Sequence, residues 1–186
     1  MTTDPIHQMS SGCPARRGRA MRGCVGVNDE KGRWRLEQGP QCLLWQLWHS
    51  ARWADRFASI VAEQAVGLRA SIPVLEIWHS NSIRNLWGWP EALELGRREA
   101  GTGVSEEGSA SLPFPSIGDV TSYAVAAFQR VEDAVAALDP TSMHQPAGAD
   151  TETWAANAVQ YLEHLPEHVA VMAALRGMQG LPAFPD

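Results

Sequence analysis

Three of the six histidines are spaced so that they could bind one metal ion. His164 and His168 are four residues apart, which on a helix places both side chains on one face, about 5–6 Å apart at Cβ. This spacing suits two imidazoles that share a divalent ion. His49 lies near the apolar face of another predicted helix, among three tryptophans, and could supply a third nitrogen. Such a site would keep an open position for water or a substrate.

The same residues also admit a simpler interpretation. An HxxxH pair arises often by chance, and a histidine beside tryptophans is more often a hydrogen-bonded core residue than a metal ligand. The pattern is not that of a thermolysin-type zinc protease, because Glu167 directly precedes His168 and no HExxH is formed. His79 and His144 lie in loop-rich regions, and we interpret them as surface residues.

Three stretches with apolar residues at helical spacing are predicted to position these histidines. They cover residues 41–66, 116–139 and about 151–180. Ser116 is a candidate N-cap of the second helix. The third helix contains the HxxxH pair with Pro166 between the two histidines, where a proline removes a backbone hydrogen bond and should kink the helix.

The middle of the chain is less regular. Residues 67–115 contain four prolines and several glycines. Short helices are predicted near 73–85 and 90–98, followed by a Gly-rich turn with the sequence AGTGVSEEGSAS. Because three long helices are predicted and no segment shows the alternation of a strand, the sequence predicts an all-α bundle.

The first forty residues differ in character from the rest. They are rich in Gly, Arg and Ser and follow neither a helical nor a strand period. We interpret residues 1–40 as an irregular N-terminal arm or a degenerate first helix, and residues 41–182 as the helical bundle. The arginines of the arm could bind an anionic surface, although the composition favours a solvated tail.

Composition excludes several classes of function. With 186 residues the chain is long enough for one domain. No apolar run approaches the ~18 residues of a membrane span, and no signal-peptide core is present, so we expect a cytoplasmic protein with no membrane partner. Residues 1–40 carry 7 of the 15 basic and 4 of the 21 acidic side chains, which leaves 8 basic and 17 acidic ones in the remainder. An acidic body of this kind argues against nucleic acid as a partner.

Two segments together resemble motifs of the DinB/YfiT-like superfamily. The second-helix motif of that group, an apolar run ending in WH followed by A-R and an acidic residue, is similar to LLWQLWHSARWADRF, which contains His49. In the last-helix motif a histidine is followed after eight residues by the arginine of Leu-Arg-Gly, as His168 is by Arg176 in HLPEHVAVMAALRGMQGLP. The intervening GTGVSEE resembles a Gly-rich turn of the group, and the resemblance covers about residues 41–182.

The resemblance implies a four-helix bundle, frequently dimeric, in which His49, His164 and His168 hold a divalent metal, most often zinc or nickel. Relatives include transferases that use mycothiol, bacillithiol or glutathione. It therefore implies a metal-dependent transferase that activates a low-molecular-weight thiol to act on a small-molecule substrate. Residues 1–40 match the first helix of the family poorly. The 14 arginines against the single Lys31 suggest a GC-rich bacterial source, which weakly favours mycothiol.

Other functions and roles stay open at this point. The bundle could be non-enzymatic or degenerate with a structural metal, or it could be a metal-dependent hydrolase, for which no general base is evident. Arg176 could bind an anionic substrate or the carboxylate of a thiol, or form a structural salt bridge. Asp55 and Glu163 could hydrogen-bond the histidines or be solvated carboxylates on helix faces. The eight tryptophans make a homodimer a reasonable expectation.

Overall fold

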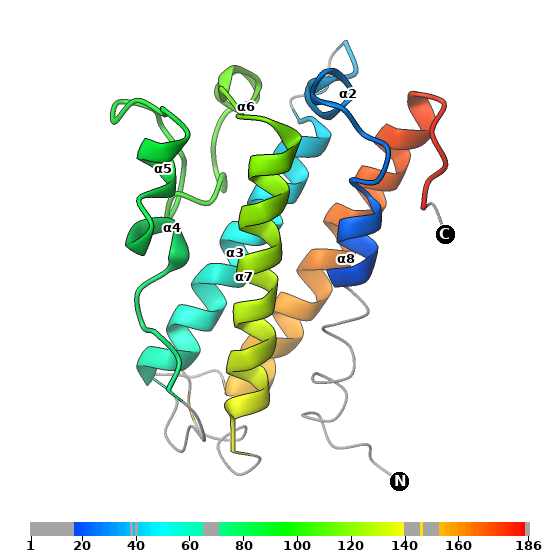
Figure 1. Ribbon diagram of the computed structural model, residues 1–186. Helices are drawn as coiled ribbons and strands as arrows, with labels where there is room; N and C mark the ends of the chain where they lie inside the picture. Colours follow the sequence, from blue (N-terminus) through cyan, green and yellow to red (C-terminus); the bar gives the residue numbers. More distant parts are fainter. Residues whose placement is uncertain are drawn as a thin grey trace, which may run out of the picture.

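Figure 1 shows the computed structural model, a bundle-like, all-α arrangement. The structure describes residues 17–37, 39, 41–64, 71–139, 146 and 153–184. Among these residues there is no β-strand, only two isolated β-bridges. The predicted all-α class is therefore confirmed. No helix in the described part of the chain is long and apolar enough to span a membrane.

Three long helices form the body of the molecule: α3 (Leu43–Gln64), α7 (Ile117–Ala137) and α8 (Trp154–Met178). In Figure 1, α3 and α7 run in the same direction, and α8 runs in the opposite direction. Helix α3 contacts both of the others. Each helix was predicted from apolar periodicity, and the bounds agree to within a few residues.

The core lies where α3 faces α7 and α8. The apolar residues at helical spacing along α3 are buried: Leu44, Leu47, Trp48, Ala51, Ala54, Ala58 and Val61. Small alanines at three of these positions let the helix axes approach closely. The apolar residues at helical spacing along α7 are buried as well: Val120, Tyr123, Ala127, Val131, Ala134 and Val135. The side chain of Ser116 accepts a hydrogen bond from the backbone N–H of Asp119 at 3.1 Å, so the predicted N-cap is confirmed.

Helix α8 ends as the sequence suggests. Gly180 has a φ of +70°. The backbone N–H groups of Gly180 and Leu181 donate to the carbonyls of Gly177 and Arg176, both at 3.0 Å, which is a Schellman motif. Pro166 lies inside the helix on an exposed position, and the helix continues through it.

The middle region corrects two predictions. The helix expected near 73–85 is split into α4 (Ile77–Ser80) and α5 (Ile83–Leu86), because Ser82 adopts a left-handed conformation with φ 48°. The helix expected near 90–98 does not form. Instead the chain reverses around residues 96–103, with Arg98 and Glu99 at positive φ and a bridge between residues 97 and 102.

The Gly-rich turn also contains a helix that the sequence analysis missed. Helix α6 (Glu106–Ser111) begins after Ser105, whose hydroxyl accepts a hydrogen bond from the backbone N–H of Gly108 at 3.0 Å. Glu106 and Glu107 occupy its first turn, where negative charge is favoured. A serine followed by two glutamates is a helix-start signal, but the surrounding glycines obscured it.

The described part of the N-terminal segment packs against the bundle. Residues 17–22 are helical, and α2 (Asp29–Arg33) follows with Asn28 as its N-cap. Arg17 forms an ion pair with Glu132 of α7 at 3.0 Å. Figure 1 shows the 17–22 helix beside α8. Residues 1–16 of the predicted arm lie outside the described residues, and a domain boundary near residue 40 stays a prediction.

Candidate metal centre

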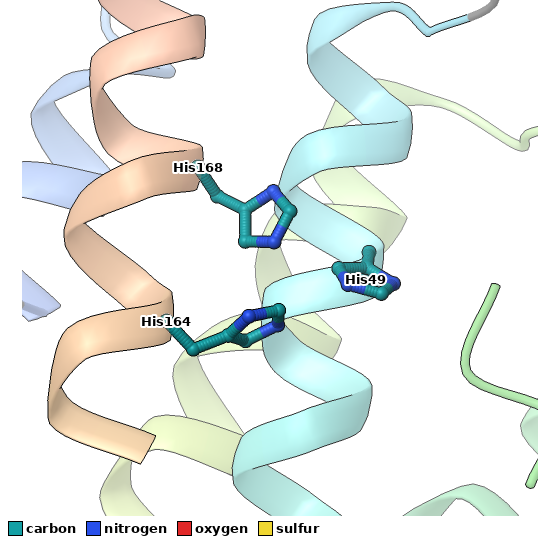
Figure 2. A group of neighbouring side chains, drawn as sticks. All are labelled: His49, His164 and His168. Atoms are coloured by element: carbon teal, nitrogen blue, oxygen red, sulfur yellow. The ribbon is translucent and has the colours of Figure 1, made fainter. Parts of the chain in front are cut away.

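The three predicted histidines meet between α3 and α8. His49 projects from α3, and His164 and His168 project from successive turns of α8, with all three rings converging in Figure 2. The ring centroids are 5.1 Å apart for His49 and His164, 4.6 Å for His49 and His168, and 4.4 Å for the α8 pair. One nitrogen from each ring lies within 4.8 Å of the other two. No other described residues form a comparable group of His, Cys, Asp or Glu.

Hydrogen bonds orient two of the three rings. Nδ1 of His49 contacts the backbone carbonyl of Ala100, and Nδ1 of His168 lies 2.5 Å from Oε1 of Gln46. A carbonyl oxygen only accepts, so each Nδ1 carries the hydrogen of the neutral ring and each Nε2 keeps a free lone pair. The amide nitrogen of Gln46 in turn donates to Oε1 of Gln41, which fixes the direction of the Gln46 amide. This is the arrangement that holds histidine ligands on metals.

The third ring shows that the site fits an ion. Nε2 of His164 is buried and has no hydrogen-bond partner within the described structure. A buried polar atom without a partner is costly, and such atoms in native proteins are usually explained by a water or an ion. Zn–N bonds are about 2.0–2.1 Å long, so three imidazole nitrogens this close could reach one tetrahedral ion with small rotations of the rings. The residues could therefore hold a divalent metal.

Two tryptophans enclose the histidines. The ring of Trp45 stacks on His49 with centroids 4.5 Å apart and an interplanar angle of 13°. Trp53 contacts His164 edge-on, with centroids 5.5 Å apart. Both tryptophans lie on α3, one turn before and one turn after His49. They limit the rotations open to the imidazoles and cover part of their surface.

The carbonyl of Ala100 reaches His49 only because the next residue is glycine. Gly101 has a φ of +85°, and a Cβ there would lie 2.9 Å from the Trp48 ring and 3.1 Å from Nδ1 of His49. Any larger side chain would push the loop away from α3. Gly101 therefore lets a backbone acceptor approach a buried histidine.

A buried arginine holds the same loop from the opposite side. Nε of Arg52 donates to the carbonyl of Glu99 at 2.9 Å, and Nη2 donates to the carbonyl of Arg98 at 3.2 Å. Both acceptors are residues at positive φ, where non-glycine backbone is strained. The Glu99 carboxylate accepts a further bond from Nε1 of Trp78 at 2.7 Å. These bonds place the carbonyl of Ala100, the next residue, against His49.

Burial keeps the imidazoles neutral. It lowers the pKa of His49 to about 4, although the hydrogen bond to Ala100 opposes the shift. Burial, together with the neighbouring His49 and His164, lowers the pKa of His168 to about 3. The pKa of His164 is also lowered by burial, against the opposing charge of Glu167. Metals bind neutral imidazole, so protons compete little with an ion at neutral pH.

A cavity of about 360 Å³ lies beside the centre and shares His164 with it. Its other walls come from the next two turns of α3, from Tyr161 on α8 and from Arg98 on the loop. A ligand in this cavity would approach the histidines from the side of His164.

Other residues singled out from the sequence lie elsewhere. The Arg176 guanidinium is buried and donates to the backbone carbonyls of Gly23, Val25 and Pro182 at 2.7–2.9 Å. These bonds favour a structural role, and its binding of an anionic ligand stays a prediction. Glu163 is exposed on α8. His79 is exposed on α4, and His7 and His144 fall outside the described residues.

Asp55 is neither a solvated carboxylate nor a partner of the histidines. It is fully buried and accepts hydrogen bonds from Tyr123 at 3.1 Å and from the backbone N–H groups of Ile77 and Trp78 at 3.0 and 2.9 Å. It also pairs with two arginines, Arg52 and Arg130. Asp55 thus anchors the start of α4 to α3.

Sequence reasoning missed the residues that do orient the histidines. Gln46 is the one polar residue in the apolar run LLWQLW before His49, and its side chain is fully buried. A polar residue on a predicted core face needs a partner, which was a usable signal. The sequence contains no comparable signal for the carbonyl of Ala100.

Replacing Gln46 by leucine should weaken metal binding by about 10–100-fold, the usual effect of losing a partner that orients a ligand. Leucine is similar in size but offers His168 no acceptor, so the ring would lose its fixed orientation. Titration of the metal-free protein with zinc measures the change. The same exchange at Gln129, an exposed residue of α7, should leave the affinity unchanged. Equal affinities for the Gln46 variant and the parent protein would show that Gln46 does not orient the site.

The metal-free protein should lose stability as the pH falls below about 6.5. Between that ordinary pKa and the lowered values of about 4 and 3, the unfolded chain takes up protons at His49 and His168 while the folded chain does not. The free energy of unfolding must then decrease as pH decreases. Urea unfolding in the presence of a chelator measures it between pH 7.5 and 4.5. A His168→Phe variant should show a smaller decrease, and a profile parallel to the parent would contradict the assignment.

Comparison with known proteins finds a similarity in fold to a solved structure. No protein-family model matches the chain, and no curated protein matches it. Among solved structures, the chain is similar to the crystal structure of a conserved protein from Enterococcus faecalis, with a TM-score of 0.72. The two are 12% identical, and the match covers 94% of this chain and 95% of the other. At this identity the likeness concerns the fold, a helical bundle in which this chain carries a three-histidine centre.

Proposed function

We propose that the protein is a metal-dependent transferase of the DinB/YfiT-like kind, which activates a low-molecular-weight thiol for attack on a small electrophile. The convergence of three neutral imidazoles on one point carries the proposal, together with Nε2 of His164, which has no partner among the described residues. The order of the two sequence motifs around His49 and His168 supports the family assignment.

Three protein ligands are typical of catalytic rather than structural sites, because they leave a position for another ligand. A divalent ion held there would supply a positive charge that lowers the pKa of a bound thiol, so that the thiol would lose its proton to solvent at neutral pH. The thiolate sulfur would then form a bond to carbon while an epoxide C–O or aryl C–Cl bond breaks; the epoxide oxygen takes a proton from water, and chloride leaves as an ion.

The residues of the chain have distinct parts in this proposal. His49, His164 and His168 hold the ion, and Ala100 and Gln46 keep two of them in the required tautomer. Trp45 and Trp53 cover part of the rings. Partial removal of the rings from water strengthens the electrostatic effect of a charge bound there.

The test has two stages. Elemental mass spectrometry of protein purified without a histidine tag should find a divalent metal near one equivalent, zinc or nickel being expected. The loaded protein is then assayed with an epoxide and with a chloroarene, each with cysteine, glutathione, bacillithiol and mycothiol. The proposal predicts a rate that needs both thiol and metal and is lost in His49→Ala. A loaded protein with no thiol-dependent rate would count against the transferase.

A structural metal is the alternative, and it is favoured by the position of the centre between two long helices. Chelation distinguishes the two functions. If the helical circular dichroism signal collapses when the metal is removed, the ion mainly holds α3 against α8. If the fold persists and only turnover is lost, the ion serves the reaction.

A further inference from the structure

The cavity beside the metal centre has two kinds of wall. Apart from His164 it is lined by Trp53, Arg56, Phe57, Ile60, Arg98 and Tyr161. Four of these residues come from one stripe of α3, at spacings of three and four residues, which continues the stripe of His49. Its volume of about 360 Å³ falls in the range of small-molecule sites, about 300–1,000 Å³.

One part of the wall is aromatic and apolar. Phe57 of α3 and Tyr161 of α8 stack with centroids 5.3 Å apart and an interplanar angle of 2°. Trp53 and Ile60 lie one turn to either side of Phe57 on α3. A flat apolar group could lie against these side chains and remove their surface from water.

The other part of the wall is cationic. The guanidinium of Arg98 has no hydrogen-bond or ion-pair partner among the described residues, while its backbone carbonyl is fixed by Arg52. Arg56 forms an ion pair with Glu76 at 3.1 Å, and its Nε is buried without a partner. Glu76 lies closer still to Arg52, at 2.8 Å, so it neutralises Arg56 only in part.

The cavity lining therefore carries an excess of positive charge. Among the described residues Arg98 is unpaired, and Arg56 shares the Glu76 carboxylate with Arg52. Both arginines line a single cavity, and a guanidinium binds a carboxylate through two parallel hydrogen bonds.

We propose that the cavity binds a small organic carboxylate, with the carboxylate at Arg98 and Arg56 and the apolar or aromatic body against Trp53, Phe57 and Ile60. In this position the ligand would extend toward His164 and the metal centre, so the carboxylate would be the class of substrate on which the proposed transferase acts. That last step rests on the proposed function, whereas binding of the carboxylate does not.

Isothermal titration of the protein with phenylacetate tests the proposal, with phenylacetamide as its uncharged analogue. Both titrations are made on metal-free and on zinc-loaded protein. Phenylacetate should bind at least about 10-fold more tightly than the amide, since a hydrogen-bonded charge is worth more than a neutral contact. Arg98→Gln should weaken phenylacetate binding by a similar factor and leave the amide unaffected. Arg97→Gln is the matched control, because Arg97 is exposed like Arg98 but lies outside the cavity lining.

Three results would overturn the proposal. The first is equal binding of phenylacetate and phenylacetamide, and the second is unchanged phenylacetate binding by Arg98→Gln. The third is phenylacetate binding that requires zinc and does not depend on Arg98, because the ion rather than the arginines would then hold the anion. Zinc binding is measured separately. A protein that binds zinc but not phenylacetate would refute this inference alone. One that binds phenylacetate through Arg98 but holds neither zinc nor nickel would refute the proposed function alone.

Discussion

Replacement of His168 by alanine should abolish stoichiometric metal binding. A three-histidine centre would be reduced to two ligands from different helices, and the buried amide of Gln46 would lose its partner. The loss should exceed the roughly 10–100-fold that removal of an orienting partner costs, because a ligand itself is removed. Elemental mass spectrometry after dialysis, together with zinc titration of the metal-free protein, measures the effect.

The matched control is His79→Ala. His79 is an exposed histidine of α4 outside the centre, so its removal should leave metal content unchanged. Circular dichroism of both variants verifies that the helices remain. Metal content of His168→Ala equal to that of the parent protein would mean that the ion binds elsewhere. The three histidines would then be hydrogen-bonded core residues, as the simpler interpretation of their spacing had it.

The elements that carry the histidines were predictable from local pattern. Apolar residues at helical spacing located α3, α7 and α8, and they placed His164 and His168 on one face of α8. Periodicity is a property of neighbouring residues, so it survives in a single sequence. His49 faces the same point only because α3 packs on α8. The residues alone only suggested this packing, and the family resemblance implied it.

The loop that approaches His49 could not be predicted. Ala100 is 51 residues from His49 in sequence, and it contributes a backbone carbonyl that any residue would possess. The turn also depends on Arg98 and Glu99 at positive φ, which their residue types disfavour. Residues 90–98 were instead predicted to form a short helix, and only the Gly-rich stretch from Ala100 onward was predicted as a turn. Tertiary bonds from Arg52 override this local preference, and nothing in the local sequence reports them.

Arg52 connects this loop to the buried charges beneath it. Its guanidinium contacts the carbonyls of Arg98 and Glu99, the Glu76 carboxylate at 2.8 Å and the Asp55 carboxylate at 3.5 Å. The position of the loop, and with it the acceptor for His49, therefore depends on carboxylates that never touch the centre. Asp55 is the carboxylate with the most partners in this network.

Asp55→Asn should lower the free energy of unfolding by about 3–5 kcal/mol, the usual cost of removing one partner of a buried ion pair. The exchange preserves shape but withdraws the negative charge that Arg52 and Arg130 share, and both arginines are buried. One oxygen also becomes an amide nitrogen, so a donor such as the Trp78 N–H at 2.9 Å or the Tyr123 hydroxyl at 3.1 Å loses its acceptor. Urea unfolding of the metal-free protein measures the loss.

The same exchange at Asp133 of α7 isolates the effect of burial. Asp133 is exposed and accepts one hydrogen bond from Gln129 at 2.9 Å, so its replacement by asparagine should change stability by less than about 0.5 kcal/mol. If Asp55→Asn were as mild as Asp133→Asn, the buried arginines would have to find other compensation, and Arg52 would not need Asp55 to hold the loop. If it is as costly as expected, zinc affinity of the surviving folded protein should fall too, because the support of Ala100 against His49 passes through Arg52.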